Sequence, residues 1–211
     1  MPLALRLKKE AHREIAKAQD LIVEAMYSIF NNAVLHGGTA IWRCYNGNRF
    51  SEDVDVYIKK DIAKLEGLFE ALAKAGFAIE KKKISENSVY SNLMLNRREV
   101  RFEAVFKKAQ GSLADFEKAD GNFIAVYALT PEELIKEKTR AYLRRLKVRD
   151  LYDIFFLIKH VKDKTAVIAE LKTLLKGFKE PVDAEELKVL ILEGIVPEAG
   201  KMIDYIRRYS G

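Results

Sequence analysis

The feature that most constrains this chain is a pair of aspartates, Asp53 and Asp55, in the run Asp-Val-Asp-Val. Side chains two residues apart on a strand point to the same face, so the run predicts projecting carboxylates, with Val54 and Val56 facing a core. Adjacent anions repel unless a cation neutralises them, and oxygen ligands without clustered Cys or His favour Mg²⁺ or Mn²⁺. We therefore expect a divalent metal site that serves phosphate chemistry. The alternative is an ordinary solvent-exposed strand face.

A Gly-Gly-Thr turn precedes the aspartates by about thirteen residues. Gly37 and Gly38 can adopt backbone conformations closed to other residues, and they leave room for a ligand. Thr39 and the N–H groups after it open a predicted helix, whose N-terminus attracts anions. We expect this turn to bind phosphate groups.

Two runs of the sequence carry a family resemblance. The run GGTAIWRCYNGNRFSEDVDV resembles the AbiEii/AbiGii-type nucleotidyltransferase toxins, whose hallmark is GGTAL, a gap, and then RFSxDxD. The run EKTRAYLRRLKVRDLYDIFFL resembles the C-terminal motif of the same family, EKxxAxxxRxxxRDxxDL. At motif level the resemblance covers residues 33–60 and 130–158. Its C-terminal positions are taken here by Lys138, Arg145, Arg149, Asp150 and Asp153.

The resemblance implies a DNA polymerase β-like nucleotidyltransferase fold and a metal-dependent enzyme. Such an enzyme moves a nucleoside monophosphate from an NTP to an acceptor hydroxyl and releases pyrophosphate. The implied acceptor is RNA, tRNA above all, and the implied role is the toxin of a toxin–antitoxin or phage-defence system with a cognate antitoxin protein. Two alternatives stay open: a protein or small-molecule acceptor, or a non-catalytic nucleotide- or RNA-binding module.

The resemblance also implies roles for individual residues. Relatives in the superfamily place a third metal-binding acid on the strand beside the aspartates, and strand parity puts Arg101 and Glu103 on one face. Glu103 is thus the expected third ligand and Glu99 the substitute, unless Glu103 pairs with Arg101 or a lysine. The implied catalytic residues are Asp53, Asp55, Lys138 and Asp150. The implied nucleotide- or phosphate-binding residues are Gly37, Gly38, Thr39, Arg49, Ser51, Arg149 and Asp153.

The acids of the second motif have a structural alternative. Asp150 in the first turn of a helix is stabilised by the macrodipole, and Asp153 could bridge to Arg149. The helix around them, however, is apolar on nearly all sides, so it should be buried, and a buried acid needs partners. We favour a network in which Asp150 or Asp153 fixes Lys138 or a bound nucleotide.

Periodicity predicts an α/β or α+β fold with two parts, a mixed-sheet core over residues 1–128 and a helical domain over 129–211 packed on it. The resemblance implies that the first part is the nucleotidyltransferase core. Thr130 should cap a helix that begins with Pro131, in a capping box with Glu133. Asp183 should open another helix in the same way. The expected helices of the core cover 7–31, the segment after the Gly-Gly turn, and 60–75, and its strands cover 77–82, 88–95, 100–106 and 123–127.

Charge and composition add two expectations. The net charge of +6 and the pI near 9.2 suit a polyanionic partner. The densest basic cluster is either a solvated helix face or a phosphate-binding patch. No signal peptide or membrane span is predicted, and the single Cys44 excludes an intramolecular disulfide, so we expect a cytoplasmic protein. The cluster consists of Arg140, Arg144, Arg145, Lys147 and Arg149.

Overall fold

The computed structural model describes residues 2–211, which divide into two compact units. Unit 1 consists of residues 2–46 and Phe50–Ala128, and unit 2 consists of Gly47–Arg49 and Leu129–Gly211. The second unit therefore takes three residues from the loop just before the aspartate pair. Within residues 2–211 no helix is both long and apolar enough to cross a membrane.

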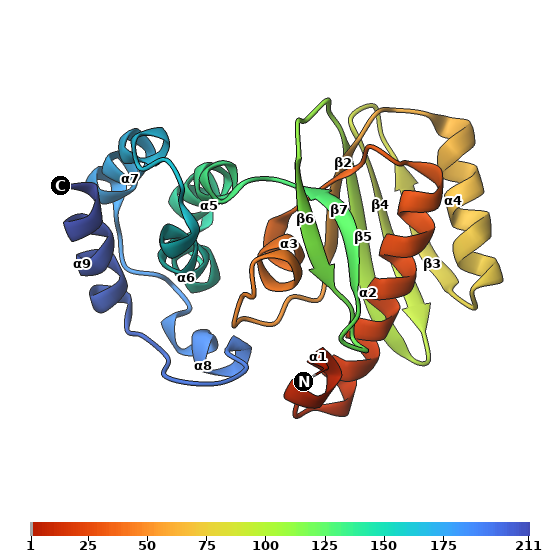
Figure 1. The fold of residues 1–211 in the computed structure, drawn as a ribbon, viewed down its shortest axis with the longest axis horizontal. Helices are drawn as coiled ribbons and strands as arrows, with labels where there is room; N and C mark the ends of the chain where they lie inside the picture. The colour runs from red at the N-terminus through yellow and green to blue at the C-terminus, as the bar shows by residue number, and fades with distance from the viewer. Residues whose placement is uncertain (1) are drawn as a thin grey trace. The chain divides into compact units, whose positions relative to one another are not determined.

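Unit 1 is built on a mixed sheet with strand order β3-β4-β5-β2-β1-β7-β6 (Figure 1). The pairings β2·β5 and β1·β7 are parallel, and the remaining pairings, including β1·β2 between them, are antiparallel. Strands β3, β4 and β5 form the predicted meander. The bounds are β1 Val34–His36, β2 Val54–Ile58, β3 Ala78–Ile84, β4 Ser88–Leu95, β5 Arg98–Phe106, β6 Ser112–Glu117 and β7 Phe123–Ala128.

Helices lie on both faces of this sheet (Figure 1). Helix α2 packs on α4, β5 and β2, whereas α3 packs on β1, β2 and β6. The core-facing side chains of α2 include Ile22 and Met26, both fully buried, as helical spacing predicts. The helices of unit 1 are α1 Leu3–Arg6, α2 Glu10–Ile29, α3 Gly37–Cys44 and α4 Ile62–Lys74.

Unit 2 is helical. Its first helix begins as predicted: Thr130 accepts from the Glu133 N–H, and the Glu133 carboxylate accepts in turn from the Thr130 N–H. Asp183, predicted to open a full helix, instead precedes a 3₁₀ turn and a helix of four residues. The elements are α5 Pro131–Arg145, α6 Val148–Leu157, η1 Ile158–His160, α7 Thr165–Gly177, η2 Ala184–Glu186, α8 Leu187–Leu190 and α9 Ala199–Ser210.

Candidate active site

Two carboxylates stand side by side on neighbouring strands of unit 1. Strands β2 and β5 are parallel, and their register sets Asp55 directly opposite Glu103. Val54 and Val56 are fully buried while Asp55 is half-buried, so the predicted alternation of core and projecting side chains is present. Side chains directly opposite in register share a face, so these two carboxylates project together.

Asp53 lies one residue before β2, not on the strand as its sequence pattern suggested. Its carboxylate accepts a hydrogen bond from the Arg101 guanidinium on β5. The side chains of Asp53 and Arg101 remain 23% and 39% exposed, so the pair is open to solvent and to ligands. Burial lowers the pKa of Arg101, but Asp53 and then Asp55 more than offset this effect, so the net pKa is raised. Arg101 thus neutralises part of the acidic cluster.

The Gly-Gly turn is pressed against the second aspartate. Gly37 begins α3 with φ +70°, a conformation that L side chains rarely adopt. A Cβ at Gly37 would overlap Oδ2 of Asp55. The close approach explains why this position must be glycine, and it puts the first turn of α3 beside the carboxylates.

A buried glutamine ties the turn to the aspartate segment. Gln19 on α2 is fully buried, and its amide nitrogen donates to the Ser51 carbonyl at 2.9 Å. The Thr39 hydroxyl, also buried, donates to the Asp53 carbonyl. The hydroxyl of Thr39 therefore holds the backbone in place, and only its N–H group remains a candidate for phosphate binding.

The donor set at this site fits Mg²⁺ or Mn²⁺. Asp53, Asp55 and Glu103 offer only carboxylate oxygens, the ligands that both ions prefer. As the side chains stand within residues 2–211, no group of three or more His, Cys, Asp or Glu residues has the spacing of a complete metal site. One of these carboxylates, that of Asp53, is engaged by Arg101.

Glu99, the substitute for Glu103, sits differently. It is exposed, and its carboxylate accepts from the Asn92 amide at 3.1 Å. Four residues along β5 separate it from Glu103, about 13 Å at strand spacing. Glu103 is therefore the better partner for Asp55.

Unit 2 holds a buried network of ion pairs between α5 and α6. The Asp153 carboxylate accepts from Lys138 Nζ at 2.7 Å, and Lys138 also lies 3.6 Å from Asp150. Arg145 binds Asp150 through two hydrogen bonds of 2.7 and 2.8 Å. Both aspartates and Lys138 are more than 90% buried.

Arg49 completes this network. Its Nε and one terminal nitrogen both donate to Asp153 at 2.8 Å, in the two-pronged geometry that arginine favours. Burial alone would raise the pKa of Asp153, but Arg49 and Lys138 more than offset it, so the pKa is lowered. Asp153 thus binds Arg49 rather than the neighbouring Arg149, which is half-buried. Arg49, Lys138 and Arg145 face two carboxylates, which leaves one positive charge in excess.

Sequence reasoning assigned no role to Gln19. Its one signal was a polar residue on the apolar side of the α2 pattern, where a buried amide must find partners. The ion pair between Arg49 and Asp153 was likewise absent from the expectations, because its members are 104 residues apart.

The mixed sheet, the in-register carboxylates and the Gly-Gly turn define a protein of the nucleotidyltransferase fold. MenT4, a nucleotidyltransferase toxin from Mycobacterium tuberculosis, matches with a TM-score of 0.66 at 18% identity, over 99% of this chain and 90% of its own. JHP933 from Helicobacter pylori matches with a TM-score of 0.65 at 22% identity, over 97% and 91% of the two chains.

Family comparison is more specific. The family described as "Nucleotidyl transferase AbiEii toxin, Type IV TA system" matches residues 23–199. The chain therefore belongs to this family of nucleotidyltransferase toxins, as the two sequence motifs predicted. No match was found among curated proteins.

Proposed function

We propose that this chain is a divalent-metal-dependent nucleotidyltransferase that transfers a nucleoside monophosphate from an NTP to a hydroxyl group of RNA, with tRNA the expected acceptor. The observation that carries the proposal is the register of Asp55 with Glu103, beside Asp53 and the turn at Gly37. Membership of the toxin family supports the same reaction class. We further propose a role as the toxin of a toxin–antitoxin or phage-defence system, with an antitoxin protein as partner.

The carboxylates of Asp53, Asp55 and Glu103 would hold Mg²⁺ or Mn²⁺. When bound, such a metal lowers the pKa of the attacking hydroxyl and neutralises charge on the triphosphate. In the transfer, the acceptor oxygen bonds to the α-phosphorus while the bond from that phosphorus to the bridging oxygen breaks. Pyrophosphate leaves with the electron pair, and the hydroxyl proton passes to solvent.

The turn and the loop orient the nucleotide. The backbone N–H groups of Gly38 and Thr39 open α3, so they offer donors for phosphate oxygens. Because Gly37 has no Cβ, the Asp55 carboxylate can lie directly against the turn. Ser51 is buried, and its carbonyl is held by Gln19, so it contributes by keeping the segment before Asp53 in place.

The ion-pair network of unit 2 would supply positive charge for the phosphates. Lys138 and Arg149 are the proposed phosphate-binding residues, Lys138 as a point charge with donors to spare beyond its bond to Asp153. Asp150 and Asp153 orient the cations around them. Arg49 acts through Asp153, as a positioning residue rather than a direct ligand. The excess of one cation in this network supports an anionic substrate.

The experiment is incubation of the purified protein with Mg²⁺, total tRNA and each α-³²P-labelled NTP in turn. The test variants are Asp55→Asn and Glu103→Gln, and the matched control is Glu99→Gln on the same strand. We expect label on RNA from one nucleotide, reduced about a hundredfold or more in both test variants and unchanged in the control. Equal activity in Glu103→Gln and the wild type would reject Glu103 as a metal ligand.

The two alternatives give distinct results in the same experiment. Label on the protein itself, or on a co-purifying protein, would move the acceptor from RNA to protein. No transfer to any acceptor, together with nucleotide binding that survives Asp55→Asn, would favour a non-catalytic binding module.

A further inference from the structure

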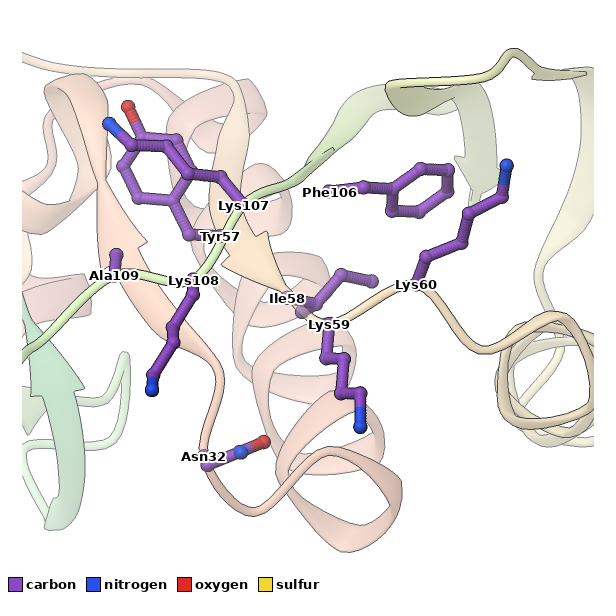
Figure 2. Close-up of a pocket in the computed structure, with 9 residues that line it drawn as sticks. All are labelled: Asn32, Tyr57, Ile58, Lys59, Lys60, Phe106, Lys107, Lys108 and Ala109. Atoms are coloured by element: carbon purple, nitrogen blue, oxygen red, sulfur yellow. The ribbon is translucent and has the colours of Figure 1, made fainter.

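A pocket of about 390 Å³ opens where strands β2 and β5 of unit 1 end (Figure 2). The two strands are parallel, and their last residues, Ile58 and Phe106, are partners in the register. The chain continues past each strand with two lysines, and the Lys107 N–H still donates to the Ile58 carbonyl at 3.1 Å. Four lysines therefore line one pocket: Lys59, Lys60, Lys107 and Lys108.

These four charges are not neutralised by neighbouring acids. All four lysines are exposed, and within residues 2–211 none of them forms an ion pair. The nearest acid along the chain, Asp61, accepts from the Lys64 N–H as the N-cap of α4. Glu86 contacts Lys60 through its backbone carbonyl, which accepts from Lys60 Nζ at 3.2 Å. The positive potential is thus available to an anionic ligand.

The aromatic rings at the pocket are already covered. The Lys107 ammonium lies 4.7 Å from the ring centre of Tyr57, and Lys60 lies 5.5 Å from that of Phe106. The Tyr57 ring also stacks on His36, with 4.0 Å between centroids. The Tyr57 face that stacks on His36 is closed to a nucleobase, and a lysine ammonium lies close to each ring. The pocket therefore favours contact with phosphate groups over stacking with bases.

The remaining two lysines reach outward together. In Figure 2, Lys59 and Lys108 project to the same side of the two strand ends, next to the side chain of Asn32. Lysine presents a point charge on a flexible stem, without the two-pronged geometry of arginine. Such groups bind phosphates at a range of positions, which suits a backbone contact independent of sequence.

The pocket is separate from the carboxylates but within reach of one polymeric ligand. Lys59 directly follows β2 and is four residues from Asp55. At strand spacing this separation is about 13 Å. A single phosphate cannot span that distance. A strand with repeated phosphates can lie in the pocket and extend to the acids.

We propose that this lysine pocket binds backbone phosphates of an RNA strand, at a second site apart from the metal-binding carboxylates. The choice of RNA rests on the proposed acceptor. The binding itself requires no transfer chemistry, so it is measured without NTP and can be judged separately from activity.

The test is fluorescence anisotropy of a labelled 20-residue oligouridylate with the full chain, over a series of salt concentrations. The variant is Lys59→Gln/Lys108→Gln, and the charge-matched control is Lys172→Gln/Lys176→Gln on the exposed side of α7. Each phosphate contact on a single strand contributes about 0.7 to the slope of log K against log salt. For the pocket variant, we expect a slope that is shallower by about 1.4, for two lost contacts, and an affinity about tenfold weaker at low salt. The control variant should keep the wild-type slope and affinity.

Three results would overturn the proposal. The first is a pocket variant that melts like the wild type and keeps the wild-type slope and affinity. The second is an equal loss in the pocket and control variants, because the effect would then be one of total charge. The third is weakened binding of inorganic tripolyphosphate with unchanged RNA binding, which would assign the pocket to a free polyphosphate. Asp55→Asn should abolish transfer and leave oligouridylate binding intact, so a failure of the transfer chemistry can be distinguished from a failure of RNA binding at the pocket.

Discussion

The Arg101 guanidinium binds the Asp53 carboxylate across 48 residues of sequence, at the position where the site needs a cation. Asp55 adds to the electrostatic stabilisation of the same guanidinium. Arg101 and the proposed divalent metal would therefore compete for one carboxylate. The chain carries an internal counter-ion that keeps the acidic cluster from repelling itself in the absence of metal.

Removal of this counter-ion should strengthen metal binding. We expect Arg101→Gln to bind Mn²⁺ about tenfold more tightly. A cation in contact with a carboxylate lowers its pKa by about one unit or more, and the same attraction must be overcome when a metal takes its place. The measurement is Mn²⁺ titration followed by electron paramagnetic resonance, without nucleotide. Arg97→Gln, in the exposed turn before β5, is the control and should keep the wild-type affinity. Weaker Mn²⁺ binding in Arg101→Gln would show that Arg101 supports the site rather than competing for it.

The turn at Gly37 should tolerate no side chain. Gly37→Ala forces a Cβ into the Asp55 carboxylate and strains a backbone at φ +70°, so we expect a loss of about 1–3 kcal/mol in unfolding free energy and loss of transfer. Gly67→Ala is the matched control. Gly67 lies within α4 with nothing near its added Cβ, so that variant should gain about 0.5–1 kcal/mol. Urea titration compares the two, and a Gly37→Ala protein as stable and active as wild type would contradict the geometry.

Gln19 should prove to be a positioning residue. Gln19→Leu removes the donor to the Ser51 carbonyl and the acceptor for Arg43, which donates at 3.2 Å, so buried groups lose their partners. We expect a cost of about 1–3 kcal/mol. The measurement that distinguishes positioning from stability alone is Mn²⁺ affinity at a temperature where the variant is folded. An affinity equal to wild type would limit Gln19 to a role in stability.

Local signals in the sequence predicted most elements of the fold. The capping box at Thr130 and the glycine after α4 act within a few residues, so they can be seen without the fold. Strand β6 was not predicted, because its run Ser-Leu-Ala-Asp-Phe-Glu lies at the sheet edge with Leu113 exposed. An edge strand that leaves apolar residues in solvent lacks the alternation on which the prediction depends.

For the candidate site, the sequence indicates residue types but not the pairing of charges. Motif and parity selected Asp53, Asp55 and Glu103 as candidates, because residue type and spacing can be read from the sequence. The partner of each charge depends on register and on contacts between distant segments. Parity puts Arg101 and Glu103 on one face of the strand and leaves a pair between them open, whereas the Arg101 guanidinium binds Asp53. Likewise Asp153 had a plausible neighbour in Arg149, but its partners are Arg49 and Lys138.

Loss of one member of the ion-pair network should strongly destabilise unit 2. Asp153→Asn leaves Arg49 and Lys138 without their shared carboxylate, and we expect a cost of about 3–5 kcal/mol. Asp204→Asn breaks only the exposed pair with Arg207 and should cost less than about 1 kcal/mol. Chemical denaturation at pH 7 measures both.

The lowered pKa of Asp153 predicts how the stability of the protein changes in acid. The pKa of Asp153 is lowered on folding, so the unfolded state binds its proton first. Its contribution is complete above the ordinary value of 3.8 and is lost as pH falls through the folded pKa. The wild type should therefore lose more stability than Asp153→Asn between pH 5 and pH 3. Parallel losses would indicate that other carboxylates govern acid unfolding.

His12 should make unit 1 less stable in mild acid. Its ring stacks on Phe50 at 3.9 Å between centroids, and burial, with a smaller effect of Lys9, lowers its pKa below 6.5. The unfolded state then binds the proton more readily, so stability is complete above pH 6.5 and falls as pH drops from there towards the folded pKa. We expect His12→Gln to lose less stability than the wild type between pH 7.5 and 5.5 in urea titrations. Burial also lowers the pKa of His160 in unit 2, so this histidine acts in the same direction. A variant with both histidines replaced by glutamine should therefore lose the least stability. An unchanged pH dependence in the double variant would show that neither imidazole is held neutral by the fold.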